Sequence, residues 1–505
     1  MRKLIYLTAA LVCAAGIGIA GVYLTACGRT AETGAAASGV SENILPEEAV
    51  SANDVAETET SEEESGTEVA SLAETETDSE EPWIRSEEER VKVKGIYVTG
   101  AMAGTSGMDQ LISLVDRTEL NAMVIDVKND DGRVVWEMDA PMVDAIGADK
   151  KLVSDMPGLV KKCKEHGIYL IARIVAFKDP YLAEQREDLA LHDKEGNLFR
   201  DNSGLAWVNP YEEEVWEYLL EIAEEAVEVG FDEIQFDYIR FATDKGMKNV
   251  DFGPNAVGKD KETVITEFVS YAAERLHEAG VPVSADVYGI IIDSKLDASL
   301  VGQNYYEMSK HLDYISPMVY PSHYGPGNLG LAVPDAQPYE TIYRSMSASR
   351  KVLSGMQEEE GTVSGNTVSA EDGNPFPESG VSGNAIGQNG PDEETVSGNR
   401  VPDEETVSGN HVPDAGSAEP DPKSMEPAEE IRADVRPWLQ DFTATWVDGH
   451  IQYGPEEIRA QIQAVYDAGY EEWILWNAAN RYTEGGLLTA QEELEEEAAA
   501  SALEE

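Results

Sequence analysis

Four stretches of this sequence share one pattern, in which a helix-forming segment ends at a glycine that leads directly into an apolar segment. They are KEHGIYLIARI, VEVGFDEIQF, HEAGVPVSAD and YDAGYEEWIL, with the glycines at Gly167, Gly230, Gly280 and Gly469. Glycine suits the position just past a helix because it adopts the left-handed conformation at little cost. Helix then strand, repeated along a chain, predicts parallel strands joined by crossover helices.

Eight segments have the composition expected of such strands, and they begin at residues 93, 122, 168, 232, 282, 313, 436 and 471. Eight parallel strands with intervening helices over roughly three hundred residues predict an α/β fold of the (β/α)8 TIM-barrel type. An open doubly wound sheet is the alternative. However, the segment after the first strand, GAMAGTSG, lacks the glycine spacing of a phosphate-binding loop.

The first 27 residues have the features of a signal peptide, with Arg2 and Lys3 ahead of an apolar run that stops at LTAC, Leu24 to Cys27. LTAC resembles the lipobox of bacterial lipoproteins, in which the cysteine is lipidated. We therefore expect lipidation of Cys27 and a membrane as one partner of the chain. An uncleaved transmembrane helix is the alternative. Either reading places the remaining residues outside the cytoplasmic membrane.

Two low-complexity segments divide the rest of the chain. Residues 28–92 form an acidic stretch with almost no aromatic residues, which predicts a disordered tether. Residues 356–430 contain an eleven-residue repeat, PDEETVSGNRV followed by PDEETVSGNHV, and are expected to be disordered as well. The barrel would then comprise residues 93–355 and 431–486, with an acidic tail at 487–505. Because the second segment joins a helix to a strand, we expect it on the barrel face away from the site.

Composition also narrows the possible partners. The net charge of −60 argues against nucleic acid, whose phosphates bind clustered Lys and Arg. The histidines show no paired ligand spacing, so zinc is not predicted, and no other cofactor is required. Cys163 would stand alone in the mature domain, as an inert helix residue.

The strand FDEIQFDYIRF, residues 231–241, alternates polar and apolar side chains. In a barrel strand, alternate residues face the lumen and the surrounding helices. We therefore expect Gln235 and Asp237 to point inward, and the residues that alternate with them, Ile234, Phe236 and Tyr238, to face the helices. By the same rule, Asp126 and Asp286 point inward from neighbouring strands.

Three inward aspartates near one opening should differ in pKa, unless Lys128 and Arg173 pair with some of them. Cleavage of a glycosidic bond needs two carboxyl groups, of which one protonates the leaving oxygen and the other attacks or activates water. We expect Asp237 to act as nucleophile or base and Asp286 as acid. Structural ion pairs that plug the barrel are the alternative.

Further substrate contacts are expected from polar and aromatic side chains at the strand ends and loops. Flat apolar faces with polar edges suit sugar rings. The expected substrate-binding residues are Asp126, Lys128, Arg173, Trp207, Arg240, Tyr320, His323, Gln440, Trp476 and Asn477, with Trp438 and Tyr324 as additional aromatic surfaces.

Three motifs resemble a bacterial family of glycoside hydrolases of uncharacterised function, whose members are TIM barrels distantly similar to alpha-amylases. They are NAMVIDVKNDDGRV, WVNPYEEEVWEYLLEIAEEAVEVGFDEIQFDYIRF and YISPMVYPSHYGPG. The likeness covers Val93 to about Gly355 and Pro437 to Tyr482. It implies that Asp237 is the nucleophile at the end of the fourth strand. It also implies an acid after the fifth strand, where Asp286 replaces the glutamate of amylases, and a third aspartate that corresponds loosely to Asp441.

These observations predict a surface-tethered glycoside hydrolase that acts on an extracellular or cell-wall polysaccharide. A non-catalytic, glycan-binding envelope lipoprotein would use the same groove without turnover. A structural envelope protein, the third possibility, would have no affinity for glycans.

Overall fold

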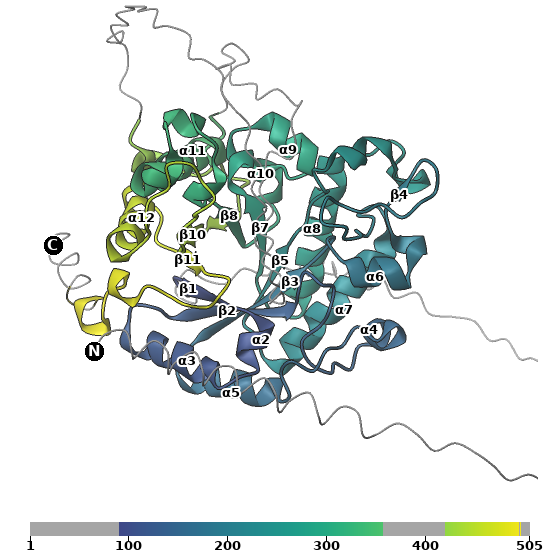
Figure 1. Cartoon of the computed structure of the whole chain (residues 1–505), viewed down its shortest axis with the longest axis horizontal. Coiled ribbons are helices and arrows are strands. Elements are labelled where there is room, and N and C mark those ends of the chain that lie inside the picture. The colour runs from purple at the N-terminus through teal and green to yellow at the C-terminus, as the bar shows by residue number, and fades with distance from the viewer. Residues whose placement is uncertain (1–89, 357–419, 494, 496–505) are drawn as a thin grey trace, which may run out of the picture. The chain divides into compact units, whose positions relative to one another are not determined.

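The computed structural model describes residues 90–356, 420–493 and 495 (Figure 1). The predicted signal peptide with Cys27, the predicted tether up to residue 89 and both copies of the eleven-residue repeat lie outside these residues. Within them, no helix is long and apolar enough to cross a membrane.

Eight parallel strands close into a barrel, which confirms the predicted (β/α)8 fold. Each strand pairs with the next, and the ring closes between β11 and β1 and between β8 and β10. The strands are β1 Lys94–Val98, β2 Ala122–Lys128, β3 Tyr169–Val175, β5 Glu233–Asp237, β7 Val283–Tyr288, β8 Tyr314–Met318, β10 Trp438–Gln440 and β11 Trp473–Trp476. A short strand, β9 Asp434–Val435, pairs with the start of β8 just before β10.

Helices surround the barrel in the connections between strands (Figure 1). The longer ones are α3 Gly107–Arg117, α5 Met156–Glu165, α7 Glu213–Val229, α8 Lys261–Glu278, α11 Pro338–Leu353 and α12 Pro455–Asp467. The shorter ones are α2 Gly100–Ala103, α4 Pro141–Ile146, α6 Pro180–Gln185, α9 Lys295–Val301 and α10 Tyr305–Met308. Their apolar faces pack on the outward residues of the strands in one large core.

The four glycines of the helix–strand pattern follow α5, α7, α8 and α12. Gly167, Gly230, Gly280 and Gly469 have φ angles of 71°, 109°, 80° and 86°, which lie in the left-handed region. Only glycine adopts this region without strain. The local pattern therefore sets four of the points at which the chain turns from helix into strand.

Inside the barrel lies a cluster of apolar side chains, and polar side chains lie near both ends of the strands. The buried members of the apolar cluster are Val93, Tyr97, Ala122, Val124, Tyr169, Ile171, Tyr320, Trp438 and Ile474. Near the amino-terminal ends of the strands, the fully buried Arg436 pairs with Glu233 and Glu472, each at 2.8 Å. Polar groups on this face of a TIM barrel serve stability, whereas sites form at the carboxyl ends.

Long loops follow β3 and β5. The first loop contains β4 His192–Asp193 and the second contains β6 Val250–Asp251, and these two strands pair antiparallel. The loops that follow the neighbouring strands β3 and β5 are therefore linked by backbone pairing between β4 and β6.

The connection from α11 to β9 is the one that carries the low-complexity segment. The described chain resumes at residue 420, with a 3-10 turn at Pro422–Ser424, so the folded part includes about ten residues that the sequence pattern assigns to that segment. The backbone N–H of Ala428 donates to the carbonyl of Leu353 at 2.8 Å, which brings the returning chain back beside the end of α11.

Candidate active site

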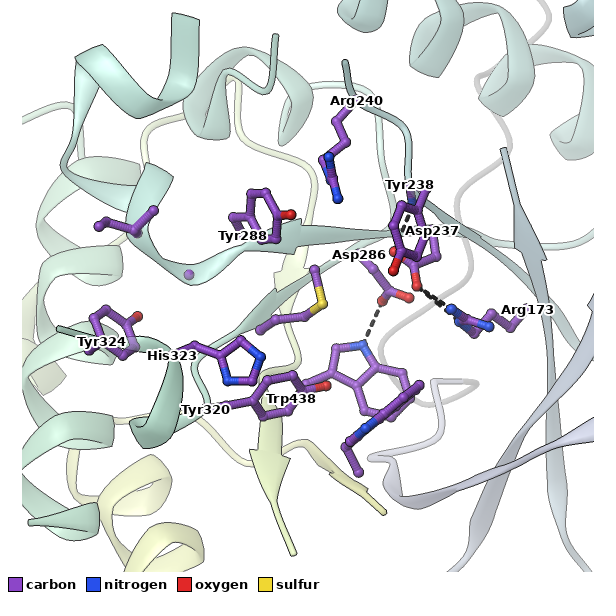
Figure 2. Close-up of a pocket in the computed structure, with 14 residues that line it drawn as sticks. Arg173, Asp237, Tyr238, Arg240, Asp286, Tyr288, Tyr320, His323, Tyr324 and Trp438 are labelled. Atoms are coloured by element: carbon purple, nitrogen blue, oxygen red, sulfur yellow. Dashed lines mark hydrogen bonds and ion pairs between the residues drawn. The ribbon is translucent and has the colours of Figure 1, made fainter. Parts of the chain in front are cut away.

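A pocket lies at the carboxyl ends of the barrel strands (Figure 2). Seven of the predicted site residues line it: Arg173, Asp237, Arg240, Asp286, Tyr320, His323 and Trp476. They come from β3, β5, β7 and β11 and from the loops after β5 and β8. The closed barrel therefore brings together side chains that are separated by up to three hundred residues of sequence.

Arg173 lies between two of the three inward aspartates. Its Nη1 donates to Asp126 Oδ1 at 2.6 Å, and its Nε donates to Asp237 Oδ2 at 3.0 Å. The hydroxyl of Tyr97 donates to the other oxygen of Asp126 at 2.6 Å. Burial raises the pKa of Asp126, and the guanidinium of Arg173 opposes that rise. Asp126 does not line the pocket, and its ion pair with Arg173 constrains the guanidinium that also contacts Asp237.

Asp237 is the last residue of β5, and the chain bends sharply after it. Tyr238 has a φ of 52°, an uncommon value for a residue other than glycine, and its N–H donates to Asp237 Oδ1 at 2.6 Å. Strand alternation therefore stops at Asp237. The alternation predicts that Tyr238 faces only the helices, but its ring also lines the pocket. Asp237 thus accepts hydrogen bonds on both carboxylate oxygens, which fix the orientation of its side chain.

Asp286 on β7 has a different environment. Its side chain is buried, and Trp438 Nε1 donates to its Oδ1 at 2.6 Å. It forms no ion pair with any residue that the structure describes. Burial and then the neighbouring charge of Asp237 raise the pKa of Asp286 well above the usual range for aspartate. Asp286 is therefore the carboxyl group of the pocket that favours the protonated form.

Lys128 and Trp207 lie outside the pocket. A register shift in the pairing of β2 with β3 falls between Asp126 and Lys128. Lys128 is fully buried and its Nζ pairs with Asp179 at 2.8 Å, rather than with Asp126. Trp207 is also fully buried and donates to Asp201 at 3.0 Å. Both side chains support the loops around the pocket.

Gln440 and Asn477 hold the loops after β8 and β10. Gln440 Oε1 accepts from the backbone of Ser322 at 3.0 Å, and Asn477 Nδ2 donates to the carbonyl of Asp441 at 2.5 Å. Asp441 itself accepts two hydrogen bonds from Thr483, and burial raises its pKa. None of the three predicted positions, Gln440, Asn477 and Asp441, lines the pocket.

Several lining residues were not predicted as site residues from the sequence: Tyr238, Tyr288, Gly289, Ile290 and Met318. At Gly289 a Cβ atom would lie 2.5 Å from Tyr324 Oη and 2.6 Å from the carbonyl of Met318, so this position admits only glycine. The sequence signal was a glycine directly after the fifth strand, in PVSADVYGI. A glycine at that position can have several structural causes. The close approach of Tyr324 and of the carbonyl of Met318 is apparent only from the three-dimensional structure.

Aromatic rings extend from the pocket toward solvent. Trp476 stacks on Tyr97 with 4.0 Å between ring centroids, and Tyr320 lies 6.4 Å from Trp476. Phe442 lies 6.3 Å from Tyr320, and Trp446 stacks on Phe442 at 6.0 Å. Trp446 is 60% exposed. The series therefore ends in an open aromatic face.

The remaining candidates for a metal or thiol site are the histidines and Cys163. Among residues 90–356 and 420–493, no group of three or more His, Cys, Asp or Glu side chains is arranged to hold a metal ion. Burial lowers the pKa of His323 to about 4, so its imidazole is neutral at pH 7. Burial raises the pKa of Cys163 on α5 to about 11, which keeps this thiol unreactive.

Comparison with protein families identifies the family of the chain. Residues 95–362 and 417–482 match the family described as "Putative glycosyl hydrolase domain". The chain belongs to this family. The match spans both parts of the barrel and confirms the resemblance seen in the three motifs. It places the chain among the glycoside hydrolases, and the pocket with Asp237 and Asp286 is the candidate active site of that family's domain.

Solved structures similar to the chain include a hypothetical protein from Ruminiclostridium thermocellum, with 43% identity over 38% of this chain and 97% of that one, and a TM-score of 0.35. The PgaB (BpsB) glycoside hydrolase domain from Bordetella bronchiseptica has 10% identity over 77% and 94%, with a TM-score of 0.47. The spore cortex-lytic enzyme SleL from Bacillus megaterium has 10% identity over 78% and 72%, with a TM-score of 0.39. No curated protein matches the chain.

Proposed function

We propose that this glycoside hydrolase cleaves an extracellular or cell-wall polysaccharide, with Asp286 as general acid and Asp237 as nucleophile or general base. The observation that carries the proposal is the contrast between two neighbouring carboxyl groups in one pocket. Asp237 accepts hydrogen bonds from a guanidinium and a backbone N–H, whereas Asp286 is buried and forms no ion pair among the described residues. Different environments for two carboxyl groups separate the roles of acid and base.

In this mechanism, protonated Asp286 gives its proton to the glycosidic oxygen as the bond to the anomeric carbon breaks. Asp237, as the carboxylate, either attacks that carbon or removes a proton from the attacking water. Arg173 donates to Asp237 and fixes its orientation. Tyr320, Trp438 and Trp476 supply apolar ring faces on which a sugar can lie.

The same proposal includes a location. The LTAC sequence ending at Cys27 supports a lipid anchor, and the acidic segment that follows would separate the barrel from the membrane. An enzyme held in this way would meet polymers of the cell envelope. A single N-terminal transmembrane helix would give the same placement.

A second candidate is a glycan-binding envelope protein without turnover. The observation in its favour is the ion-paired arrangement of Asp126, Arg173 and Asp237, which also suits a structural plug. It predicts affinity for glycans in the wild type and no bond cleavage for any bound ligand.

The test measures release of reducing sugar from a panel of wall and capsular glycans. We expect Asp237→Asn and Asp286→Asn each to lower turnover by about a thousandfold, in the range of lost acid–base groups. Asp441→Asn is the matched control, because Asp441 is a buried aspartate on the same barrel face that does not line the pocket. Wild-type turnover by Asp237→Asn would remove Asp237 from the mechanism.

The acid role has its own test. A dinitrophenyl leaving group departs without protonation, so Asp286→Asn should cleave a dinitrophenyl glycoside far better, relative to wild type, than it cleaves the natural linkage. An equal loss on both substrates would argue against Asp286 as the acid.

A further inference from the structure

Arg240 enters the pocket from the loop that follows β5, three residues after Asp237. Its side chain is directed toward the space between Tyr288, Tyr238 and Asp286 (Figure 2). The guanidinium carbon lies 4.6 Å from the ring centroid of Tyr288 and 4.9 Å from that of Tyr238. Trp207 adds a third ring at 5.1 Å. The residue is only 4% exposed.

This buried cation has no carboxylate partner in the part of the chain that the structure describes. Its one hydrogen bond runs from Nη1 to the carbonyl of Phe241 at 3.1 Å. The other two buried arginines of the barrel each bridge two carboxylates, Arg173 between Asp126 and Asp237 and Arg436 between Glu233 and Glu472. Arg240 is therefore the exception among them.

A buried charge without a counter-charge is unfavourable, and aromatic faces compensate only part of the loss of water. Asp237, the carboxylate at the end of the preceding strand β5, is already held by Arg173. The remaining donors of Arg240 are directed into the pocket that a substrate would enter. A negatively charged group on the substrate would complete the set of partners.

We infer that Arg240 is a specificity-determining residue that binds a carboxylate on the sugar, so that the substrate is an acidic glycan. The guanidinium offers two parallel N–H donors in a plane, which match the two oxygens of a carboxylate. The three surrounding rings hold that plane in place. This inference rests on the proposed function, because it assigns the substrate class for the same pocket.

Calorimetric titration of the purified full chain with matched sugar pairs tests the inference. The pairs are methyl glucuronoside against methyl glucoside, and N-acetylmuramic acid against N-acetylglucosamine, since the members of each pair differ by a carboxylate-bearing group. Wild type should bind the acidic member of at least one pair about tenfold more tightly. Arg240→Gln should reduce that preference to less than twofold while it leaves affinity for the neutral member unchanged.

Two further variants serve as controls. Arg240→Lys keeps the charge but loses the planar fork, so it should retain part of the preference. Arg275→Gln removes an arginine that pairs with Glu217 and Glu224 on the outer helices, and it should keep the full preference. Sulfate added as a competitor should displace the acidic sugar less well than a carboxylate does.

Equal binding of both members of each pair by wild type, binding of neither, or an acidic preference that survives Arg240→Gln would overturn the inference. Measurement of reducing-sugar release distinguishes failure of the inference from failure of the proposed function. Hydrolysis of glycans with no preference for acidic over neutral sugars in wild type, or with an acidic preference that survives Arg240→Gln, would overturn the inference and leave the proposed function intact. An acidic preference that depends on Arg240, without hydrolysis of any glycan, would contradict the proposed function and support the carboxylate-binding site.

Discussion

The indole Nε1 of Trp438, on β10, donates a hydrogen bond of 2.6 Å to Oδ1 of Asp286, on β7. The other oxygen of Asp286 accepts no hydrogen bond from any described residue. The indole therefore fixes the orientation of the carboxyl group and leaves Oδ2 as the atom that can carry a transferable proton. Two strands that are not neighbours in the barrel thus determine where the proposed acid points.

Replacement of Trp438 by Phe removes this hydrogen bond and keeps an aromatic ring. We expect kcat to fall about tenfold to a hundredfold with a small change in KM, because the acid is misoriented. The hydrogen bond from Trp438 lowers the pKa of Asp286, so its loss should move the alkaline limb of the pH–rate profile to higher pH. Trp473→Phe is the control, since the indole of Trp473 donates to the hydroxyl of Tyr466 on α12. Equal effects of both variants would contradict the assignment.

The charge of Asp237 should be visible in the titration of Asp286. Asp237 raises the pKa of Asp286 through repulsion between the two negative forms. In Asp237→Asn this repulsion is absent, so the pKa of Asp286 should fall. Carbon-13 NMR of the labelled aspartate carboxyl groups measures this shift directly. An unchanged pKa in Asp237→Asn, or an equal fall in Asp441→Asn, would show that the two carboxyl groups are not coupled.

Burial of Asp286 should make the folding stability depend on pH. The pKa of Asp286 is higher in the folded chain than in the unfolded one, so the folded state keeps a proton that the unfolded state releases. Its stabilising contribution is complete below about pH 4 and is lost as the pH rises through the folded pKa, by about 1.4 kcal/mol per pH unit at most.

Asp286→Asn does not titrate at this position. Its melting temperature should therefore match wild type near pH 4 and exceed it at pH 7, as measured by thermal denaturation at both values. A variant that is equally destabilised at both pH values would indicate a packing role for Asp286 without a titration effect.

Trp446 should contribute to binding of long substrates. It presents an open ring face at the end of the aromatic series that starts in the pocket. We expect Trp446→Ala to raise KM for a polysaccharide several-fold, in line with the loss of one stacking contact, and to leave kcat and the kinetics on a short aryl glycoside unchanged. Leu296→Ala is the control, because Leu296 is a similarly exposed apolar residue, on α9. Equal losses on long and short substrates would place Trp446 outside a polymer-binding surface.

Periodicity was sufficient to predict the barrel. The positions of all eight strands followed from apolar segments, and the inward direction of Asp126, Asp237 and Asp286 followed from alternation. These signals are local, and a regular strand preserves them. The sequence also placed Arg173 near the aspartates, although not its position between two of them.

Prediction failed where the backbone departs from regular geometry. The register shift after Asp126 carries Lys128 away from the pocket to Asp179, and the left-handed Tyr238 turns its ring toward the pocket. Neither departure has a signature in residue type, because lysine and tyrosine are not typical of such positions. The hydrogen bond from the indole of Trp438 to Asp286 depends on the curvature of the closed sheet. The pattern of residue types along the sequence does not encode that curvature.

The return of the chain beside α11, where Ala428 meets Leu353, has a practical consequence. Leu353 at the end of α11 and Ala428 ahead of β9 lie side by side, and lengthening a flexible connection between two such points costs only about 0.6 kcal/mol for each doubling of its length. The chain between these two points can therefore change in length at a small cost in folding free energy. An experimenter can use the same junction to attach a fluorophore or an affinity handle to the enzyme.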